Sequence, residues 1–420
     1  MTPPPATILD AFIRHADRSP GRLAIRFEGE DYSYSDLENR SNRWAGGFVA
    51  SGIAPGDRVA LCLENSVDFI GAYLGAQRAA ASIVPVNTLY RQVELRHIFN
   101  DSSARFCIVD EAKLPALNQL LGDFPSLETI VVVGSPGYET VGKVAPIRNV
   151  PKAPNVVDAR DFVRDGTILP PRPSPEDIAL IAYTSGTTGR SKGAMLSHRN
   201  LFENSRSVTG AWSWTHRDHL LLTLPLFHIH GLGVGLNGAL VTGSSIDLRR
   251  RFDPVDVLDT LALGEASMFF GVPTMYARLI AEVKKRDAPP PPIRLYVSGS
   301  APLSADTFRE FAATFGQTIL ERYGMTETVM NLSNPLDGER RPGTVGRPFP
   351  GQEARIVDLR SREPIVDART GEIQVRGPHV FSGYWRQPEA TEAAFDPEGW
   401  FNTGDLGWRS ADGYYTISGR

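Results

Sequence analysis

The residues from Tyr183 to Gly193 combine a flexible backbone, hydroxyl groups and a cation in one short stretch, Tyr-Thr-Ser-Gly-Thr-Thr-Gly-Arg-Ser-Lys-Gly. Glycines allow backbone amides to close around an anion, hydroxyls add donors, and a lysine supplies a point charge for phosphate oxygens. An apolar run at residues 178–183 leads into the stretch, so it follows a predicted strand. We therefore predict a loop that cradles phosphate, built from Thr184, Ser185, Gly186, Thr187, Thr188, Gly189 and Lys192.

Two other interpretations of this loop are weaker. In a Walker A loop the lysine follows glycine directly and precedes Ser or Thr, whereas here two residues intervene after Gly189 and Gly193 follows Lys192. A flexible Gly/Ser/Thr linker has a similar composition, but a linker does not normally connect a buried strand to a helical segment, which begins here at Arg199. The phosphate loop is therefore the favoured interpretation.

The loop resembles the signature loop of the adenylate-forming superfamily, which contains acyl-CoA synthetases, luciferases and the adenylation domains of peptide synthetases. Two later features agree in order: Glu321-Arg-Tyr-Gly-Met-Thr-Glu-Thr328 resembles the second family signature, and Gly404-Asp405 with Gly419-Arg420 resembles its ribose-binding pair. The resemblance covers essentially the whole chain. It departs at Ser191, where proline is usual, which we expect to alter the stiffness of the loop rather than its role. It implies ATP-dependent activation of a carboxylic acid as its adenylate, then transfer to a thiol, usually coenzyme A.

The resemblance also implies roles for single residues. Tyr323 would stack on adenine, Thr326 would donate to the α-phosphate, and Asp405 would accept from both ribose hydroxyls. Glu327 supplies the hard oxygen ligand that Mg²⁺ prefers. Taken alone, these residues equally fit a core tyrosine, a surface carboxylate and an aspartate of a hairpin turn, so the resemblance decides. The predicted catalytic residues are Thr326, Glu327, His228 and Lys192, and the predicted nucleotide site adds Ser300, Ala301, Pro302, Glu321, Arg322, Tyr323, Gly324, Met325, Asp405 and Arg420.

Residues 224–231, Leu-Pro-Leu-Phe-His-Ile-His-Gly, resemble the segment that lines the acyl pocket, with His228 at the gating position. Two neighbouring histidines could suggest a metal, but no third ligand is placed. Residues 271–278 and 323–335 are most similar to malonyl-CoA synthetases, which implies malonate or methylmalonate as the acid. A second carboxylate needs a cation; we predict Arg278, against the alternative of an arginine on a helix surface. The predicted acyl site is His228, Arg278, Ser298, Gly299 and Met330.

Apolar runs of strand length alternate with helical stretches along most of the chain, which predicts parallel sheets covered by helices. The predicted strands are residues 59–63, 83–86, 106–109, 130–133, 178–183, 220–224, 245–248, 268–270, 293–297 and 318–321. Ligands of open α/β sheets bind at the carboxyl ends of strands, where the phosphate loop and the run of residues 298–303 lie. The latter run also fits a simple strand-to-helix turn capped by Ser304.

Two changes of pattern divide the chain. Residues 134–173 are rich in Pro, Asn, Asp and Gly and predict a loop-rich connection. From Gly343 onward, short alternating runs and Asp-Gly turns predict small antiparallel strands. The predicted fold class is therefore α/β, with two layered subdomains of largely parallel sheets at residues 1–170 and 171–342 and a small β-barrel-like subdomain at 343–420.

Composition excludes several other classes of protein. The net charge of −4 and the pI near 6.1 give no basic field for nucleic acid or anionic lipid. Cys62 and Cys107 are too few for a disulfide framework, and no apolar stretch approaches the ~20 residues of a membrane span. We expect a cytoplasmic enzyme that uses ATP, Mg²⁺ and coenzyme A on a small carboxylic acid, without a nucleic-acid partner. The sequence does not give the oligomeric state.

Lysine is scarce in this chain, and none follows Lys285. The resemblance implies that the adenylation lysine lies in a small C-terminal domain, beyond a hinge that would begin near Arg420. We therefore expect a truncated enzyme, in which the 420 residues bind ATP or the adenylate but form adenylate and thioester poorly. The alternatives are a short- or medium-chain fatty acyl-CoA ligase, a non-catalytic nucleotide-binding module, and an amino-acid adenylation domain. The last usually has a pocket aspartate, for which no candidate lies beside Phe227 or Ser300.

Overall fold

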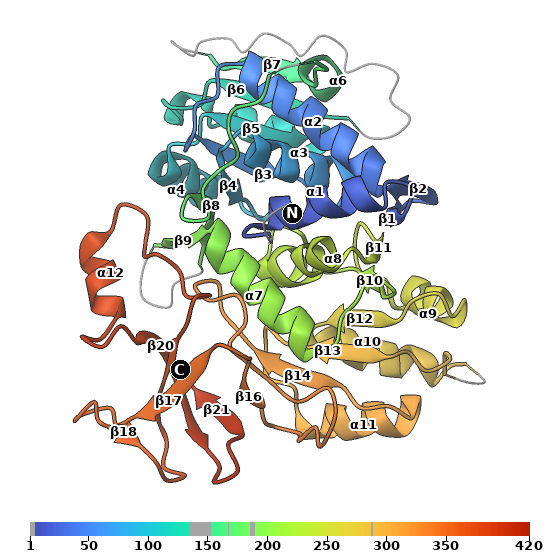
Figure 1. Ribbon diagram of the computed structural model, residues 1–420, viewed down its shortest axis with the longest axis vertical. Helices are drawn as coiled ribbons and strands as arrows, with labels where there is room; N and C mark the ends of the chain where they lie inside the picture. Colours follow the sequence, from blue (N-terminus) through green and yellow to red (C-terminus); the bar gives the residue numbers. More distant parts are fainter. Residues whose placement is uncertain (1–4, 135–152, 167, 185–189, 287–288) are drawn as a thin grey trace.

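Three β-sheets organise the chain in this computed structural model, which describes residues 5–134, 153–166, 168–184, 190–286 and 289–420. In Figure 1 a seven-stranded sheet with its helices lies at the top, a nine-stranded sheet lies below it, and a five-stranded sheet lies at the lower left. The predicted α/β class with largely parallel sheets is confirmed.

The seven-stranded sheet has the order β7-β6-β5-β3-β4-β8-β9 and is parallel except for the antiparallel pair β8–β9. Its strands β3, β4, β5, β6 and β8 are mostly buried apolar runs, as expected where helices cover both faces of a sheet, whereas the edge strand β7 is partly exposed. The strands are β3 (Arg58–Cys62), β4 (Ser82–Pro85), β5 (Phe106–Asp110), β6 (Thr129–Val133), β7 (Asn155–Asp158), β8 (Ile178–Tyr183) and β9 (Gly193–Ser197). The helices are α2 (Tyr34–Ala50), α3 (Val67–Arg78), α4 (Gln92–Ser102), α5 (Leu114–Asn118) and α6 (Ala159–Phe162).

The nine-stranded sheet has the order β16-β15-β14-β13-β12-β10-β11-β1-β2, with a parallel centre and antiparallel edges. Its strands are β1 (Leu23–Phe27), β2 (Glu30–Ser33), β10 (His219–Leu222), β11 (Ser245–Leu248), β12 (Met268–Gly271), β13 (Leu295–Ser298), β14 (Leu320–Tyr323), β15 (Leu332–Ser333) and β16 (Arg347–Pro348). The helices are α1 (Ile8–Arg18), α7 (His198–Ala211), the π-helix η3 (His230–Leu236), α8 (Asn237–Thr242), α9 (Pro254–Ala262), α10 (Pro273–Val283) and α11 (Ala305–Phe315).

The five-stranded sheet is antiparallel and has the open order β18-β17-β19-β20-β21. It occupies the part of the chain for which the sequence predicts a small barrel-like unit. Its elements are β17 (Glu353–Val357), β18 (Pro364–Ile365), β19 (Gly371–Arg376), α12 (Pro388–Ala394), β20 (Phe401–Arg409) and β21 (Tyr415–Gly419).

The sheets do not divide the chain at residue 170, where the sequence predicts a boundary. Strands β1 and β2 lie near the start of the chain but belong to the nine-stranded sheet, where β1 pairs with β11 and β2 pairs with β1. Strands β8 and β9 lie after residue 170 but complete the seven-stranded sheet. Each of the two larger sheets therefore contains strands from both sides of residue 170. The sequence did not predict this, because pairing between distant segments leaves no mark on the local sequence pattern.

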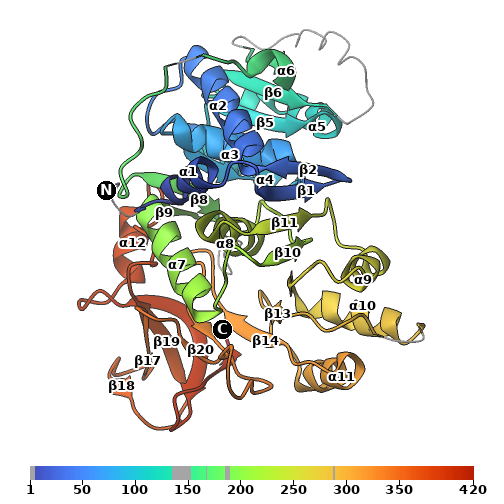
Figure 2. The ribbon, with the colours of Figure 1, turned by 45° about the vertical axis from the view of Figure 1, so that its right-hand side comes forward.

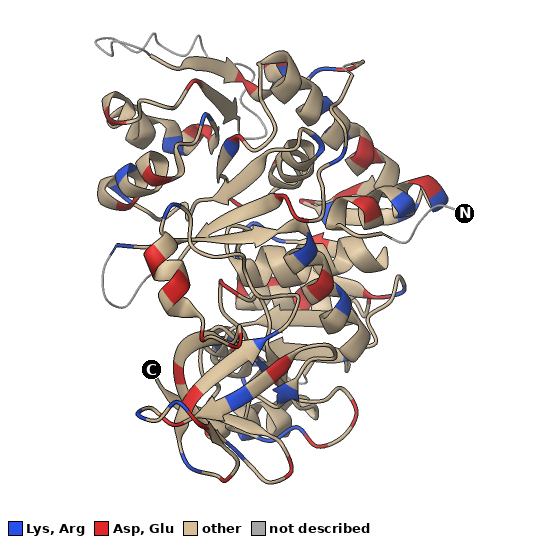
Figure 3. Ribbon diagram, turned by 60° about the vertical axis from the view of Figure 1, so that its left-hand side comes forward, with Lys and Arg blue, Asp and Glu red and all other residues tan. Residues whose placement is uncertain are grey.

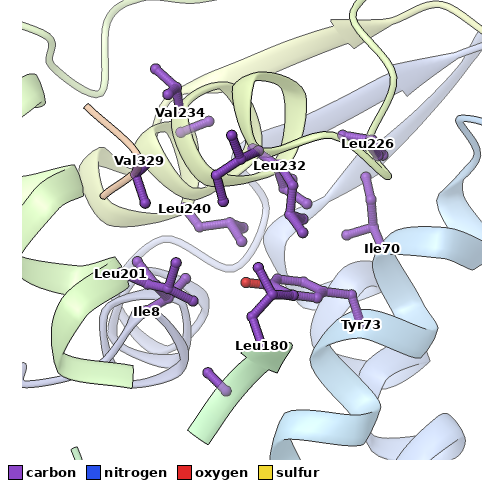
Figure 4. Packing of buried hydrophobic residues seen from close by; sticks show 14 of the residues in the cluster. Ile8, Ile70, Tyr73, Leu180, Leu201, Leu226, Leu232, Val234, Leu240 and Val329 are labelled. Atoms are coloured by element: carbon purple, nitrogen blue, oxygen red, sulfur yellow. The ribbon is translucent and has the colours of Figure 1, made fainter. Parts of the chain in front are cut away.

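A shared core joins the two larger sheets. Figure 4 shows Ile70 and Tyr73 of α3 packed toward Leu232 and Leu240, with Ile8 of α1 on the other side. The Tyr73 hydroxyl, fully buried in this core, hydrogen-bonds the Asn237 side chain of α8 at 3.0 Å. A buried polar group pairs in this way because an unsatisfied one is costly. The shared core gives the strand ends a fixed mutual position.

Acidic and basic residues are mixed over the part of the chain that the structure describes. Figure 3 shows basic and acidic positions interspersed along the ribbon rather than gathered on one face. No helix among the described residues is long and apolar enough to cross a membrane. Cys62 and Cys107 are both buried and free, with their sulfur atoms 4.0 Å apart.

Candidate active site

A cavity of about 1050 Å³ lies where the nine-stranded and five-stranded sheets meet. Figure 2 shows the C-terminus of the chain beside β14 at this junction. Several separate segments of the chain form the lining: the residues that join β8 and β9 to the phosphate loop, the start of η3, the turn after β13, β14 with the turn that follows it, Gly343 with Val345, Tyr384, and the strands β20 and β21. The site therefore forms only when both sheets are in place.

Most of the residues predicted from sequence motifs lie on this lining. They are Thr184, Lys192, His228, Ser300, Ala301, Pro302, Glu321, Arg322, Tyr323, Gly324, Met325, Thr326, Glu327, Met330, Asp405 and Arg420. The predicted loop residues Ser185, Gly186, Thr187, Thr188 and Gly189 lie outside the described residues. The roles assigned to all of these residues stay predictions, although the structure brings the described ones together.

Two contacts to the Asp405 carboxylate tie β20 to β14 and to the residue that follows β21. The Tyr323 hydroxyl donates to Asp405 Oδ2 at 2.5 Å, and Arg420 pairs with Asp405 Oδ1 at 3.0 Å. Burial is the main cause that raises the pKa of Tyr323 well above its usual value, so the hydroxyl keeps its proton and acts as the donor. These contacts hold an aromatic ring and a carboxylate side by side, as the recognition of adenine and ribose would require.

The turn after β14 has an unusual backbone. Val329, a buried β-branched residue, has a positive φ of 60°, and Ser300 across the cavity has a φ of 67°. A side chain at Gly324 would approach the Met330 Cα to 2.9 Å, so glycine is needed there. Left-handed conformations of non-glycine residues cost free energy and are concentrated at functional sites.

Glu327 is a buried carboxylate on the lining. Its Oε1 accepts a hydrogen bond of 3.0 Å from the Tyr384 hydroxyl, and burial raises the pKa of Glu327. The ammonium of Lys192 lies 4.9 Å from the centre of the Tyr384 ring. Tyr384 therefore links the acidic and the basic group of the site.

The residues present fit a Mg²⁺ ion held partly by nucleotide. No group of three or more His, Cys, Asp or Glu side chains among the described residues could hold a metal ion. Mg²⁺ is commonly bound by one or two carboxylates together with substrate phosphates and water. Glu327 supplies one such carboxylate and faces a cavity that also contains Lys192.

A buried cation also lies on the lining. Arg322 on β14 is 3% exposed, and its Nε and Nη2 have no hydrogen-bond partner among the described residues. Burial lowers the pKa of Arg322 to about 9. A Cβ atom at Gly299 would lie 2.5 Å from Nε, so the absence of a side chain there makes room for the guanidinium. Arg322 therefore carries a buried charge for which the described residues supply no hydrogen bond at Nε or Nη2.

A histidine and a serine lie on the same lining. His230 Nδ1 lies 3.2 Å from the Ser300 hydroxyl, and its Nε2, though buried, has no partner within the described chain. Burial lowers the pKa of His230 well below its usual value, so the ring is neutral. One ring nitrogen thus contacts Ser300, while the other is buried without a partner among the described residues.

Three residues of the predicted acyl site do not lie on the lining: Arg278, Ser298 and Gly299. Arg278 is exposed, because α10 turns Tyr276, Leu279 and Ile280 toward the core, and its guanidinium lies 5.0 Å from the Phe252 ring centre. The alternative of an arginine on a helix surface therefore describes its position. The prediction that Arg278 faces the acid is corrected by this placement.

Several residues of the lining carry no signal in the sequence, and two of them, Tyr384 and His230, make the polar contacts described above. Tyr384 follows the five-stranded sheet's β19 by eight residues and carries no motif, so no local signal identifies it. His230 was considered only as half of a metal pair, and its place depends on the π-helix that it begins. Such helices are rare and often occur at functional sites.

Comparison with known proteins identifies the family. Residues 12–385 match the family of AMP-binding enzymes. The chain belongs to the AMP-binding enzyme family. AMP-binding enzymes that form coenzyme A thioesters use ATP and coenzyme A, and the following relatives support an acyl-CoA ligase activity for this member.

Among the relatives of this AMP-binding enzyme is a malonate–CoA ligase of Arabidopsis thaliana, 32% identical over 98% of this chain and 70% of the relative. A sulfoacetate–CoA ligase of Cupriavidus necator is 34% identical over 93% of this chain and 73% of its own. The solved structure of ATP-bound MatB from Rhodopseudomonas palustris is 38% identical, with a TM-score of 0.85 over 98% of this chain and 78% of that chain.

Proposed function

We propose that this chain activates a small acid with a second carboxylate, malonate or methylmalonate, as its adenylate and transfers the acyl group to coenzyme A. The observation that carries the proposal is Arg322, a buried cation on the cavity lining with two nitrogens lacking partners. An arginine presents several donors in a planar fork that matches a carboxylate. Bound substrate would supply the counter-charge that the described protein does not.

The same cation would also make the proposed site reject fatty acids. An apolar acyl chain beside Arg322 would leave the guanidinium buried and unpaired, and sites with unpaired buried polar groups discriminate strongly. His230 would add a neutral ring nitrogen on the same lining, held by Ser300. The names of two relatives support this assignment, because malonate and sulfoacetate both carry two acidic groups.

Other residues of the same lining suit the nucleotide. Tyr323 and Asp405 would hold adenine and ribose, and Thr326 with Lys192 would face the phosphates. An oxygen of the acid's reacting carboxylate then forms a bond to the α-phosphorus, while the bond to the leaving pyrophosphate breaks. Lys192 stabilises the charge on the pyrophosphate. When bound at Glu327, Mg²⁺ would neutralise further phosphate charge.

In the second step a thiol attacks the acyl carbon and AMP leaves. Coenzyme A is the proposed thiol because the relatives named above are coenzyme A ligases. We also propose that the 420 residues bind nucleotide better than they turn it over. Lys192 is the one lysine on the described lining, and the family is expected to use a further lysine for adenylation.

Product analysis tests the proposal. The protein would be incubated with ATP, Mg²⁺, coenzyme A and, separately, malonate, methylmalonate, acetate or octanoate, and thioesters would be identified by mass spectrometry. We expect malonyl or methylmalonyl thioester as the main product, formed slowly. A main product from octanoate would contradict the dicarboxylate assignment, and nucleotide binding without any product from a long incubation would favour a binding module.

A further inference from the structure

We propose that His97 is a positioning residue that fixes the phosphate-binding loop from outside, by donating a hydrogen bond from Nε2 to the carbonyl oxygen of Ser191. This inference rests on the proposed function in one respect: it takes Lys192, the next residue, to contact the phosphates of ATP. The Nε2–O distance is 2.6 Å. Because a carbonyl oxygen only accepts, the ring must carry its proton on Nε2.

The His97 ring is held on a second side. It packs edge-on against the Tyr183 ring, with centroids 5.9 Å apart and an interplanar angle of 86°. Tyr183 closes β8, directly before the phosphate loop. Edge-to-face packing favours one orientation of the imidazole, and that orientation directs Nε2 at Ser191.

The helix that carries His97 is itself anchored near the loop. The Tyr183 hydroxyl donates to Asp101 Oδ2 at 2.6 Å, and Trp385 Nε1 donates to the Asp101 carbonyl at 3.0 Å. Arg386 donates to the Ser103 hydroxyl at 3.0 Å. These bonds fix the end of α4 against both β8 and the segment after β19, so His97 acts from a rigid support.

The main chain on the far side of Lys192 is also fixed. Thr184 N donates to the Lys192 carbonyl at 3.0 Å, and Trp385 N donates to the Gly193 carbonyl at 2.8 Å. Ser191 itself is the residue at which the family usually has proline, whose ring would restrict φ. The bond from His97 supplies a restraint at that position instead. Loss of the bond would free Ser191 and Lys192 without touching the strands.

Loss of the His97 bond should affect contacts with the phosphates of the nucleotide but not contacts with its adenosine. Tyr323 and Asp405, the residues proposed to hold adenosine, lie on β14 and β20, whereas the His97 ring contacts Ser191 and Tyr183. A shift of Lys192 would therefore weaken contacts with the β- and γ-phosphates and leave those with adenosine intact. ATP has these phosphates and AMP lacks them, so the ratio of their affinities reports on positioning.

The test is calorimetric titration of ATP and AMP into the full chain. We expect His97→Leu to weaken ATP binding about 5- to 10-fold, the range for one lost hydrogen bond, and to leave AMP binding unchanged. His97→Gln, whose amide nitrogen can take the place of Nε2, should restore most of the affinity for ATP. His97→Asn, which is too short to reach Ser191, should behave like the leucine variant.

His15 offers a matched control. Its Nε2 lies 3.0 Å from the Val241 carbonyl, and His15 does not line the cavity, so His15→Leu should change neither affinity. Equal weakening of ATP and AMP by His97→Leu, or no weakening of ATP, would overturn the proposal. These outcomes are independent of the acid: failure to form any thioester while the ATP-to-AMP split persists would refute the proposed function and support the role of His97.

Discussion

Replacing Arg322 with methionine should separate the stability of the protein from recognition of the acid. Arg322 is 3% exposed, and burial lowers its pKa from 12.5 to about 9. That difference corresponds to about 5 kcal/mol of penalty on the charged form. Methionine of similar length removes the penalty, so Arg322→Met should raise the free energy of unfolding by up to a few kcal/mol.

The same substitution should abolish the preference for a second carboxylate. Two charge-assisted hydrogen bonds of about 1.5–3 kcal/mol each would be lost, which predicts weaker binding by a factor of about 10² to 10³ or more. The probes are non-hydrolysable adenylate mimics, malonyl- and isovaleryl-sulfamoyl-adenosine. Isovalerate has the shape of malonate with methyl groups in place of the oxygens, so it isolates the charge.

Calorimetry with both mimics and urea unfolding would be measured on wild type, Arg322→Met and Arg278→Met. Arg278 is the matched control, because it is an exposed arginine of the same chain. We expect Arg322→Met to lose the malonyl mimic and keep the isovaleryl mimic, with little effect from Arg278→Met. Selective loss of the malonyl mimic in Arg278→Met alone would refute the reasoning.

Three further predictions follow from single contacts. Burial raises the pKa of Glu321 to about 7, so the folded protein holds a proton that the unfolded chain loses between pH 4.5 and about 7. The free energy of unfolding should fall across this window by up to about 3 kcal/mol, and Glu321→Gln, unfolded in urea at pH 5 and 8, should not show the fall. Tyr384→Phe removes the hydrogen bond that lowers the pKa of Glu327, so Glu327 should take up a proton at higher pH in the variant. The pH below which Mg²⁺-dependent ATP binding is lost should therefore rise. An unchanged pH dependence would contradict the contribution of Tyr384 to the Glu327 carboxylate. The Asn65 side chain donates to the carbonyl oxygens of Leu224 and Arg249 and accepts from the Leu226 amide. Asn65→Ala removes all three hydrogen bonds and should lower the free energy of unfolding by about 2–4 kcal/mol, measured by thermal unfolding. A loss below about 0.5 kcal/mol would contradict this prediction.

Buried parallel strands were predictable because their sequences are continuous apolar runs. The predicted strands at residues 178–183 and 245–248 coincide with β8 and β11. The short strand β9 and the pairing of β1 with β11 were not predictable, because five residues carry little periodicity and pairing across the chain is set by tertiary packing.

The site was predictable wherever a motif fixes several residues at once. Residues 321–327 and Asp405 lie together on the cavity as expected. The burial of Arg322 was not predictable from its neighbours in the sequence, because it directly follows Glu321, a charged residue. Burial of Arg322 depends on the space left by Gly299, which is 23 positions earlier in the sequence and adjacent only in the fold.

The most direct test of the central claim is the specificity of ATP–pyrophosphate exchange. The exchange rate would be measured with malonate, isovalerate and octanoate as competing acids, because the ratio of rates is independent of how slowly the chain turns over. We predict a kcat/KM for malonate at least about tenfold above that for either monocarboxylate, since only malonate pairs with Arg322. Equal or faster exchange with isovalerate or octanoate would contradict the account.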